Sequence, residues 1–170
     1  LLGGIEDEAP ARWVALVASN QTLVREGVKA LIAARSPDAQ FVDIEDVRGL
    51  TMAAGRWPDA RLALVDLCMP GLRDGVVVRE LSDRFPQLGL VALGGSLSPA
   101  VLRRVAQLAS VCAVLPRHAN LAALGAAIDA VRQGRRLGIS QDPASQHSRA
   151  ILTPRQQDIA KLLRQGLSNK

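Results

Sequence analysis

The chain has 170 residues, of which 48% are hydrophobic and 22% charged, and this composition is typical of a globular protein rather than a disordered one. No segment approaches the roughly 20 consecutive apolar residues that a transmembrane helix needs, and the acidic segment 1–11 lacks the basic start of a signal peptide. The net charge of +5 lies in residues 134–170, with seven basic and two acidic residues, whereas residues 1–133 are balanced, so contact with a polyanion is favoured at the C-terminal end.

Segment 1–11 is interpreted as a flexible arm, and no membrane contact is expected, so the predicted location is the cytoplasm. Beyond the arm, short apolar runs alternate with segments of helical periodicity. In chain order, the predicted strands and helices are strand 13–19, helix 23–34, strand 39–45, helix 47–55, strand 61–66, helix 75–85, strand 88–95, helix 98–109, strand 111–115 and helix 120–134.

Helix boundary signals support this division. Ser98 followed by Pro99 is a typical start of a helix, and Asn120 is a second candidate N-cap. Gly134 is placed where a helix would end.

Four of the five predicted strands are apolar throughout. This pattern is typical of strands that helices cover on both faces of the sheet. The prediction is therefore an α/β domain over residues 12–134, with a flavodoxin-like (βα)5 doubly wound parallel sheet of strand order 2-1-3-4-5. In such sheets a site forms at the carboxyl ends of the strands, beside the switch in strand order.

Residues 135–150 are polar and contain Gly, Pro and Ser, which predicts a linker. In the segment 151–170, Thr153 and Gln156 form a capping box around Pro154, and Ser168 starts a second helix that is cut off at Lys170. A helix, a glycine-containing turn and a new helix are the opening of a helix-turn-helix domain, truncated before its recognition helix.

These motifs together resemble response regulators of the NarL/FixJ type, in which a receiver domain precedes a LuxR-type DNA-binding domain. The resemblance is carried by four segments, LVREGVKALI (23–32), LVDLCMPG (64–71), AAIDAVRQGRRL (126–137) and LTPRQQDIAKLLRQGLSNK (152–170). It implies transcription regulation, with a phosphoryl group accepted by the aspartate carried here by Asp66. In the family, an acidic pair holds Mg²⁺ beside that aspartate, and a Lys, a Thr or Ser and an aromatic residue complete the switch.

The sequence departs from the family at each of these supporting positions. Ser19 and Asn20 stand in place of the acidic pair, Gly94 in place of the hydroxyl residue, and Arg117 and Val114 in place of the Lys and the aromatic residue. Neutral side chains do not replace the anionic oxygens that a hard divalent cation requires, so no Mg²⁺ cofactor is expected. We expect Arg117 to pair with Asp66 and hold the receiver in one state without phosphate.

The predicted function is a transcription regulator whose receiver acts through dimerisation or partner binding, with DNA bound by the C-terminal domain of a longer protein and not by this truncated chain. Two alternatives stay open: a ligand-sensing regulator with a small molecule in the former phosphate pocket, and a conventional phosphoacceptor at Asp66. An enzyme is not predicted, because a haloacid dehalogenase-type phosphatase would need a second aspartate where Cys68 stands.

Family members often dimerise through receiver helices, so a homodimer is also predicted. The apolar stripe of the last receiver helix supplies the candidate interface residues. They are Leu121, Leu124, Ile128 and Val131.

Cys68 and Cys112 form no CxxC motif, and reduced thiols without a zinc site are expected.

Overall fold

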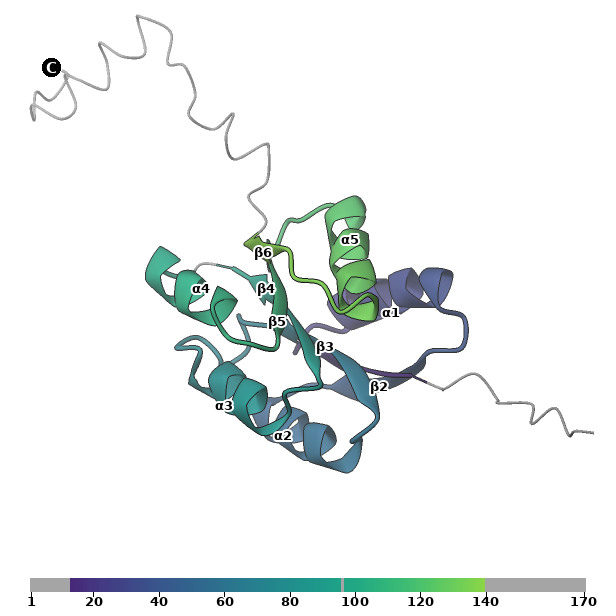
Figure 1. Ribbon diagram of the computed structural model, residues 1–170, viewed down its shortest axis with the longest axis horizontal. Coiled ribbons are helices and arrows are strands. Elements are labelled where there is room, and N and C mark those ends of the chain that lie inside the picture. The colour runs from purple at the N-terminus through teal and green to yellow at the C-terminus, as the bar shows by residue number, and fades with distance from the viewer. Residues whose placement is uncertain (1–12, 96, 140–170) are drawn as a thin grey trace, which may run out of the picture. The chain divides into compact units, whose positions relative to one another are not determined.

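The computed structural model describes residues 13–95 and 97–139, in which strands and helices alternate along the chain (Figure 1). The strands are β1 (Val14–Ala18), β2 (Gln40–Ile44), β3 (Ala60–Asp66), β4 (Gly89–Gly94), β5 (Val111–Pro116) and β6 (Gly138–Ile139). The helices are α1 (Thr22–Arg35), α2 (Val47–Arg56), α3 (Val76–Arg84), α4 (Pro99–Ala106) and α5 (Leu121–Arg132).

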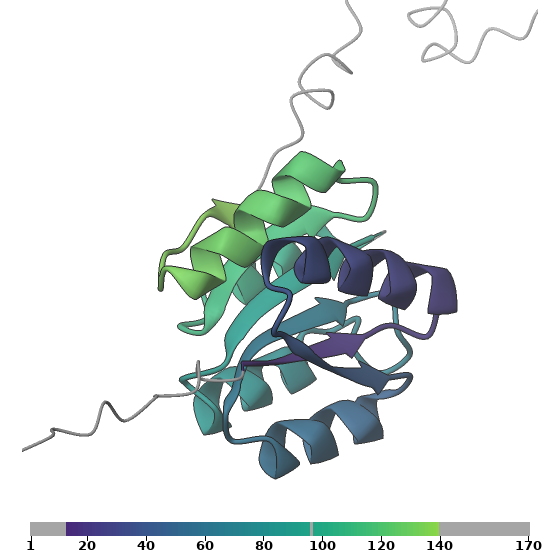
Figure 2. The same ribbon diagram turned by 90° about the vertical axis from the view of Figure 1, so that its right-hand side faces the viewer.

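All strand pairs are parallel, and their order in the sheet is β2-β1-β3-β4-β5-β6, which confirms the predicted order of the first five strands. Helices α1 and α5 cover one face of the sheet, and α2, α3 and α4 cover the other (Figures 1 and 2). The flavodoxin-like fold class is therefore confirmed.

The two faces of the sheet form two hydrophobic cores because successive side chains of a strand point to opposite faces. In β1, Leu16 belongs to the core under α2, α3 and α4, whereas Ala15 and Val17 belong to the core under α1 and α5. All three are fully buried. This two-sided burial explains why β1 reads as a continuous apolar run and does not alternate with polar residues.

The predicted helix starts at Ser98 and Asn120 are confirmed. The Ser98 hydroxyl accepts a hydrogen bond from the Val101 amide at 3.3 Å, and the Asn120 side-chain oxygen accepts one from the Ala123 amide at 2.8 Å. Each bond satisfies an amide that has no partner within its helix. Gly134 follows α5 with a φ of 63°, a left-handed conformation that suits glycine.

Strand β6 lies within the segment that the sequence assigns to a linker, and it was not predicted. It pairs in parallel with β5, and the Leu137 amide donates to the Cys112 carbonyl at 2.6 Å. The Arg136 guanidinium donates to the Ala106, Leu108 and Val111 carbonyls at 2.9, 2.8 and 3.1 Å. Arg136 therefore caps the C-terminus of α4 and holds the segment 134–139, which we call the strap, against β5.

Replacing Arg136 with glutamine is expected to loosen the strap, because three carbonyls lose a charge-assisted donor. We expect a loss of about 1 kcal/mol in the free energy of unfolding, and faster hydrogen exchange of the Leu137 amide. The matched control is Arg135→Gln, since no side-chain hydrogen bond of Arg135 is found among the described residues. Equal exchange rates in the two variants would show that Arg136 does not hold the strap.

Within residues 13–95 and 97–139, no helix is long and apolar enough to cross a membrane. The predicted arm 1–11 and the C-terminal residues Thr153, Gln156, Ser168 and Lys170 lie outside the described residues, as does most of the predicted linker.

Candidate functional site at the carboxyl ends of the strands

Asp66 is the last residue of β3 and is 1% exposed, in the position predicted for a site at the carboxyl ends of the strands. Ser19 follows β1 directly and is fully buried beside it. Because β1 and β3 are neighbours in the sheet, their carboxyl ends bring these two residues together. The prediction that Ser19 and Asp66 share one pocket agrees with this geometry.

Both carboxylate oxygens of Asp66 accept a hydrogen bond. The Ser19 hydroxyl donates to Oδ2 at 2.9 Å, and the Cys68 amide donates to Oδ1 at 2.9 Å. The Ser19 oxygen in turn accepts a bond from the Gln21 amide at 3.2 Å. The Asp66 side chain is thus held in one orientation by hydrogen bonds from residues that follow β1 and β3.

A buried arginine from α1 lies directly behind Ser19. Arg25 is 5% exposed, and its guanidinium donates to the Ser19 carbonyl at 2.6 Å and to the Glu45 carboxylate at 2.6 Å. The Asp43 carboxylate lies 3.8 Å from its Nε. A positive charge therefore sits behind the loop that carries the acidic pair in the family.

Sequence reasoning missed Arg25, although its spacing was informative. Arg25, Val28 and Ile32 follow the i, i+3, i+7 spacing of one helix face, and all three are buried. A basic residue on the inward face of an amphipathic helix requires a partner from the neighbouring chain, which here is the Ser19 carbonyl with Glu45.

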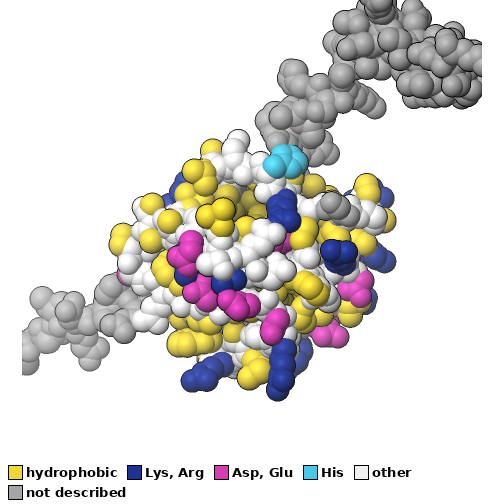
Figure 3. Space-filling model, turned by 180° about the vertical axis from the view of Figure 1, so that it is seen from behind, with side chains coloured by type: hydrophobic (Ala, Val, Ile, Leu, Met, Phe, Trp, Pro, Cys, Tyr) yellow, Lys and Arg dark blue, Asp and Glu magenta, His cyan; other side chains and the backbone are white. Residues whose placement is uncertain are grey.

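Further ion pairs join α1 to β2. Lys29 contacts Asp43 at 2.8 Å and Glu26 at 2.7 Å, and these hydrogen-bonded carboxylates, Asp43 first, raise the pKa of the Lys29 ammonium group. In the view of Figure 3, acidic side chains lie close together with basic ones between them, an arrangement expected from such pairs. Charges on this surface are therefore largely compensated locally.

The remaining predicted pocket residues are spread between the core and the surface. Val114 is buried within β5 and Gly94 at the end of β4, whereas Asn20 and Arg117 are exposed. The predicted pairing of Arg117 with Asp66 is wrong, since no ion pair joins these two described residues. The Asp66 carboxylate instead accepts hydrogen bonds from the Ser19 hydroxyl and the Cys68 amide. Arg117 follows β5 and lines a hollow beside Gly94 and Gly95.

That hollow has a volume of about 410 Å³ and is bordered by Gly94, Gly95, Leu102, Arg117 and Ile139. Gly95 is required for space, because a Cβ there would collide with the Cys68 sulfur. At Gly94, a Cβ would come within 2.9 Å of a Leu102 methyl group. The two glycines thus allow α4 and the loop after β3 to approach the end of β4 closely.

No family model matches the sequence, and no curated protein matches it either. Solved structures do match. The isolated REC domain of RcsB from Salmonella enterica serovar Typhimurium, solved with the phosphomimetic BeF3⁻, is 19% identical over 76% of this chain and 94% of its own, with a TM-score of 0.63. The signal receiver domain of NarL from Mycobacterium tuberculosis is 20% identical over 74% of this chain and 100% of its own, with a TM-score of 0.60.

The chain has the fold of a response regulator receiver domain. A structure of two RcsB dimers bound to two parallel DNAs is also similar, with 21% identity over 92% of this chain and 79% of that one, and a TM-score of 0.64. At these identities the likeness establishes the fold.

In this receiver fold, the predicted dimer stripe of α5 is divided between core and surface. Ile128 is fully buried against the sheet, which corrects its assignment as an interface residue. Leu124 and Val131 are half-buried against the same core, and only Leu121, at 69% exposure, is left on the surface. On the neighbouring helix α1, Leu23 is 85% exposed, so Leu23 and Leu121 are the large apolar side chains that these two helices leave exposed.

Proposed function

We propose that this chain is the receiver module of a transcription regulator and that Mg²⁺-dependent phosphorylation of Asp66 does not switch it. In this proposal, control acts through dimerisation or partner binding, and DNA is bound by the C-terminal domain of a longer protein. The fold supports the receiver assignment, and the DNA-bound dimers of the similar RcsB structure support the assembly and the target.

The arrangement around Asp66 carries the proposal. Both of its carboxylate oxygens already accept hydrogen bonds, and the residues that replace the acidic pair are a buried neutral hydroxyl, Ser19, and an exposed amide, Asn20. Mg²⁺ keeps its waters unless anionic oxygens replace them, so this set of residues does not fit the ion.

The Arg25 guanidinium adds a second obstacle. It donates to the Ser19 carbonyl at 2.6 Å, so this oxygen is already used by a buried donor and is not free to coordinate a divalent cation. Without a cation, a phosphoryl donor that approaches Asp66 meets the uncompensated charge of the carboxylate.

A second candidate function is the sensing of a small molecule in the former phosphate region. The hollow of about 410 Å³ beside Gly94 and Gly95 favours it, because its volume suits a small ligand and Arg117 supplies an exposed donor at its border. A ligand there would contact α4 through Leu102 and β6 through Ile139.

The test is incubation of the chain with acetyl phosphate and Mg²⁺, followed by intact mass spectrometry, beside a conventional receiver domain as positive control. We expect no gain of a phosphoryl group. Asp66→Asn serves as the matched variant, because it is close in shape and cannot form an acyl phosphate. A phosphoryl adduct on the natural chain that disappears in Asp66→Asn would overturn the proposal.

A further inference from the structure

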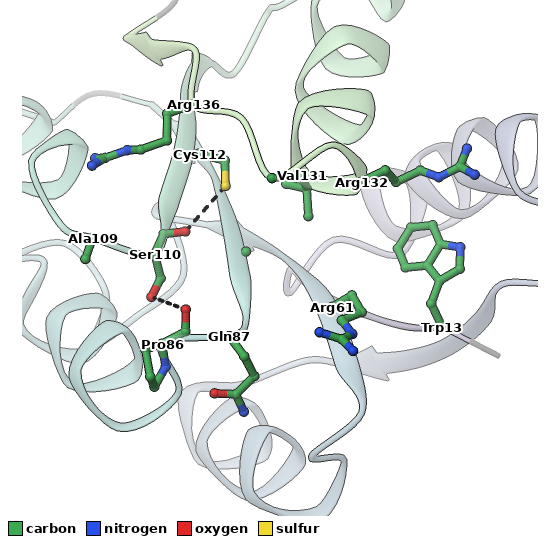
Figure 4. A pocket seen from close by; sticks show the side chains of 12 residues that line it. Trp13, Arg61, Pro86, Gln87, Ala109, Ser110, Cys112, Val131, Arg132 and Arg136 are labelled. Carbon is green, nitrogen blue, oxygen red and sulfur yellow. Dashed lines mark hydrogen bonds between the residues drawn. The ribbon is translucent and has the colours of Figure 1, made fainter. Parts of the chain in front are cut away.

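A hollow among the described residues lies at the opposite end of the sheet from Asp66. Its volume is about 620 Å³, within the range of roughly 300–1,000 Å³ typical of small-molecule sites. It is formed where the chain enters β1, β3, β4 and β5 and where α5 ends, and the strap closes one side of it (Figure 4).

The charges on its wall have one sign. Arg61, Arg132 and Arg136 line the hollow, and none of the described residues that line it is acidic. Arg132 and Arg136 donate to backbone carbonyls, and Arg61 has no hydrogen-bond partner among the described residues. None of the three arginines forms an ion pair with a described residue. A concave surface lined by charges of one sign concentrates its potential and attracts small ions of the opposite sign.

The wall also has an apolar part. Trp13 from the chain before β1, Val131 from α5 and Pro86 line the hollow together with the arginines. Figure 4 shows Trp13 and Arg61 on one side of it and Cys112 on the other. Burial raises the pKa of the Cys112 thiol, which therefore adds no negative charge at neutral pH.

One hydrogen-bond donor in this wall has no partner. The Trp13 indole nitrogen is buried and has no acceptor among the described residues. This nitrogen is closed off from solvent, so a ligand in the hollow would pack on the ring and would not bond to the nitrogen.

We propose that this hollow is a binding site for a small organic anion, a compound with an apolar body and one carboxylate. The carboxylate pairs with Arg61 and Arg132, and the apolar body packs on Trp13 and Val131. The site is separate from the Asp66 region and does not depend on the function proposed for it.

Trp13 provides the readout. The chain has two tryptophans, so a Trp57→Phe background isolates the signal of Trp13. The probes are benzoate, its neutral isostere benzamide and inorganic phosphate. We expect benzoate to change the Trp13 fluorescence and to shift its indole N–H resonance in a saturable manner, and we expect benzamide and phosphate to bind at least about 10-fold more weakly.

Arginine variants locate the site. In Arg61→Gln with Arg132→Gln, the affinity for benzoate should fall by about 10-fold or more, whereas Arg48→Gln on the exposed side of α2 should leave it unchanged. Circular dichroism confirms that each variant is folded. Equal responses to benzoate and benzamide, a response to phosphate alone, or no saturable response of Trp13 would overturn the proposal.

Discussion

Replacing Asp66 with alanine is expected to lower the free energy of unfolding by about 3 kcal/mol. The substitution leaves the Ser19 hydroxyl and the Cys68 amide without the acceptors that they have in the native protein. Ser19 is fully buried, so solvent does not supply a replacement without rearrangement of the loop. Chemical denaturation followed by circular dichroism measures the loss.

Asp66→Asn is the matched variant, with an expected loss of about 1 kcal/mol or less. The amide keeps one carbonyl oxygen for the Cys68 amide, and its NH₂ group faces the Ser19 oxygen, which can accept a bond as well as donate one. Equal losses in the two variants would mean that the carboxylate charge, and not the pair of hydrogen bonds, stabilises this end of the sheet.

Arg25→Met is expected to lower the free energy of unfolding by about 2 kcal/mol. Methionine retains the packing of the side-chain stem but removes the donor to the Ser19 carbonyl. The bond to Glu45 contributes less, because the Glu45 side chain is 74% exposed and stays hydrated when its partner is removed. The loss should therefore persist in high salt, which screens exposed pairs more than buried ones.

Lys29→Met is the control for Arg25. Lys29 contacts the same β2 residue, Asp43, but its partners Asp43 and Glu26 are carboxylates whose side chains are 48% and 61% exposed. We expect a smaller loss of stability than for Arg25→Met, and one that salt reduces. If both variants lose the same free energy of unfolding and show the same salt dependence, the buried bond from Arg25 to Ser19 contributes no more to stability than the ion pairs of Lys29.

Most of the fold could be predicted from the sequence because each central strand is buried on both faces. Such strands appear as uninterrupted apolar runs, and the caps at Ser98 and Asn120 mark where the intervening helices begin. Strand β6 could not be found in this way. It has two residues, one of them Gly138, and it is held by the Leu137 amide and by the Arg136 side chain rather than by apolar burial.

The candidate site was only partly predictable, since a single sequence identifies which residues occupy family positions but not which side chains touch. Asp66 and Ser19 were predicted to share a pocket because they follow neighbouring strands. Arg117 also follows a strand at this edge, yet its long side chain is free to take another direction, and it lies at the hollow beside Gly94. Arg25 comes from a helix, and its contact with Ser19 depends on how α1 packs on the sheet.

The strap has a mechanical consequence. It is the last described part of the chain, and it runs parallel to β5, so a pull on residues beyond Ile139 along the strand direction loads its bonds to β5 in shear. Bonds loaded together in shear yield together, whereas a perpendicular pull would open them one by one from the end. Arg136 adds to that load its bonds to the carbonyls of Ala106 at the end of α4, Leu108 in the loop that follows and Val111 in β5, so tension from the C-terminal side reaches the end of α4 before it reaches the centre of the sheet.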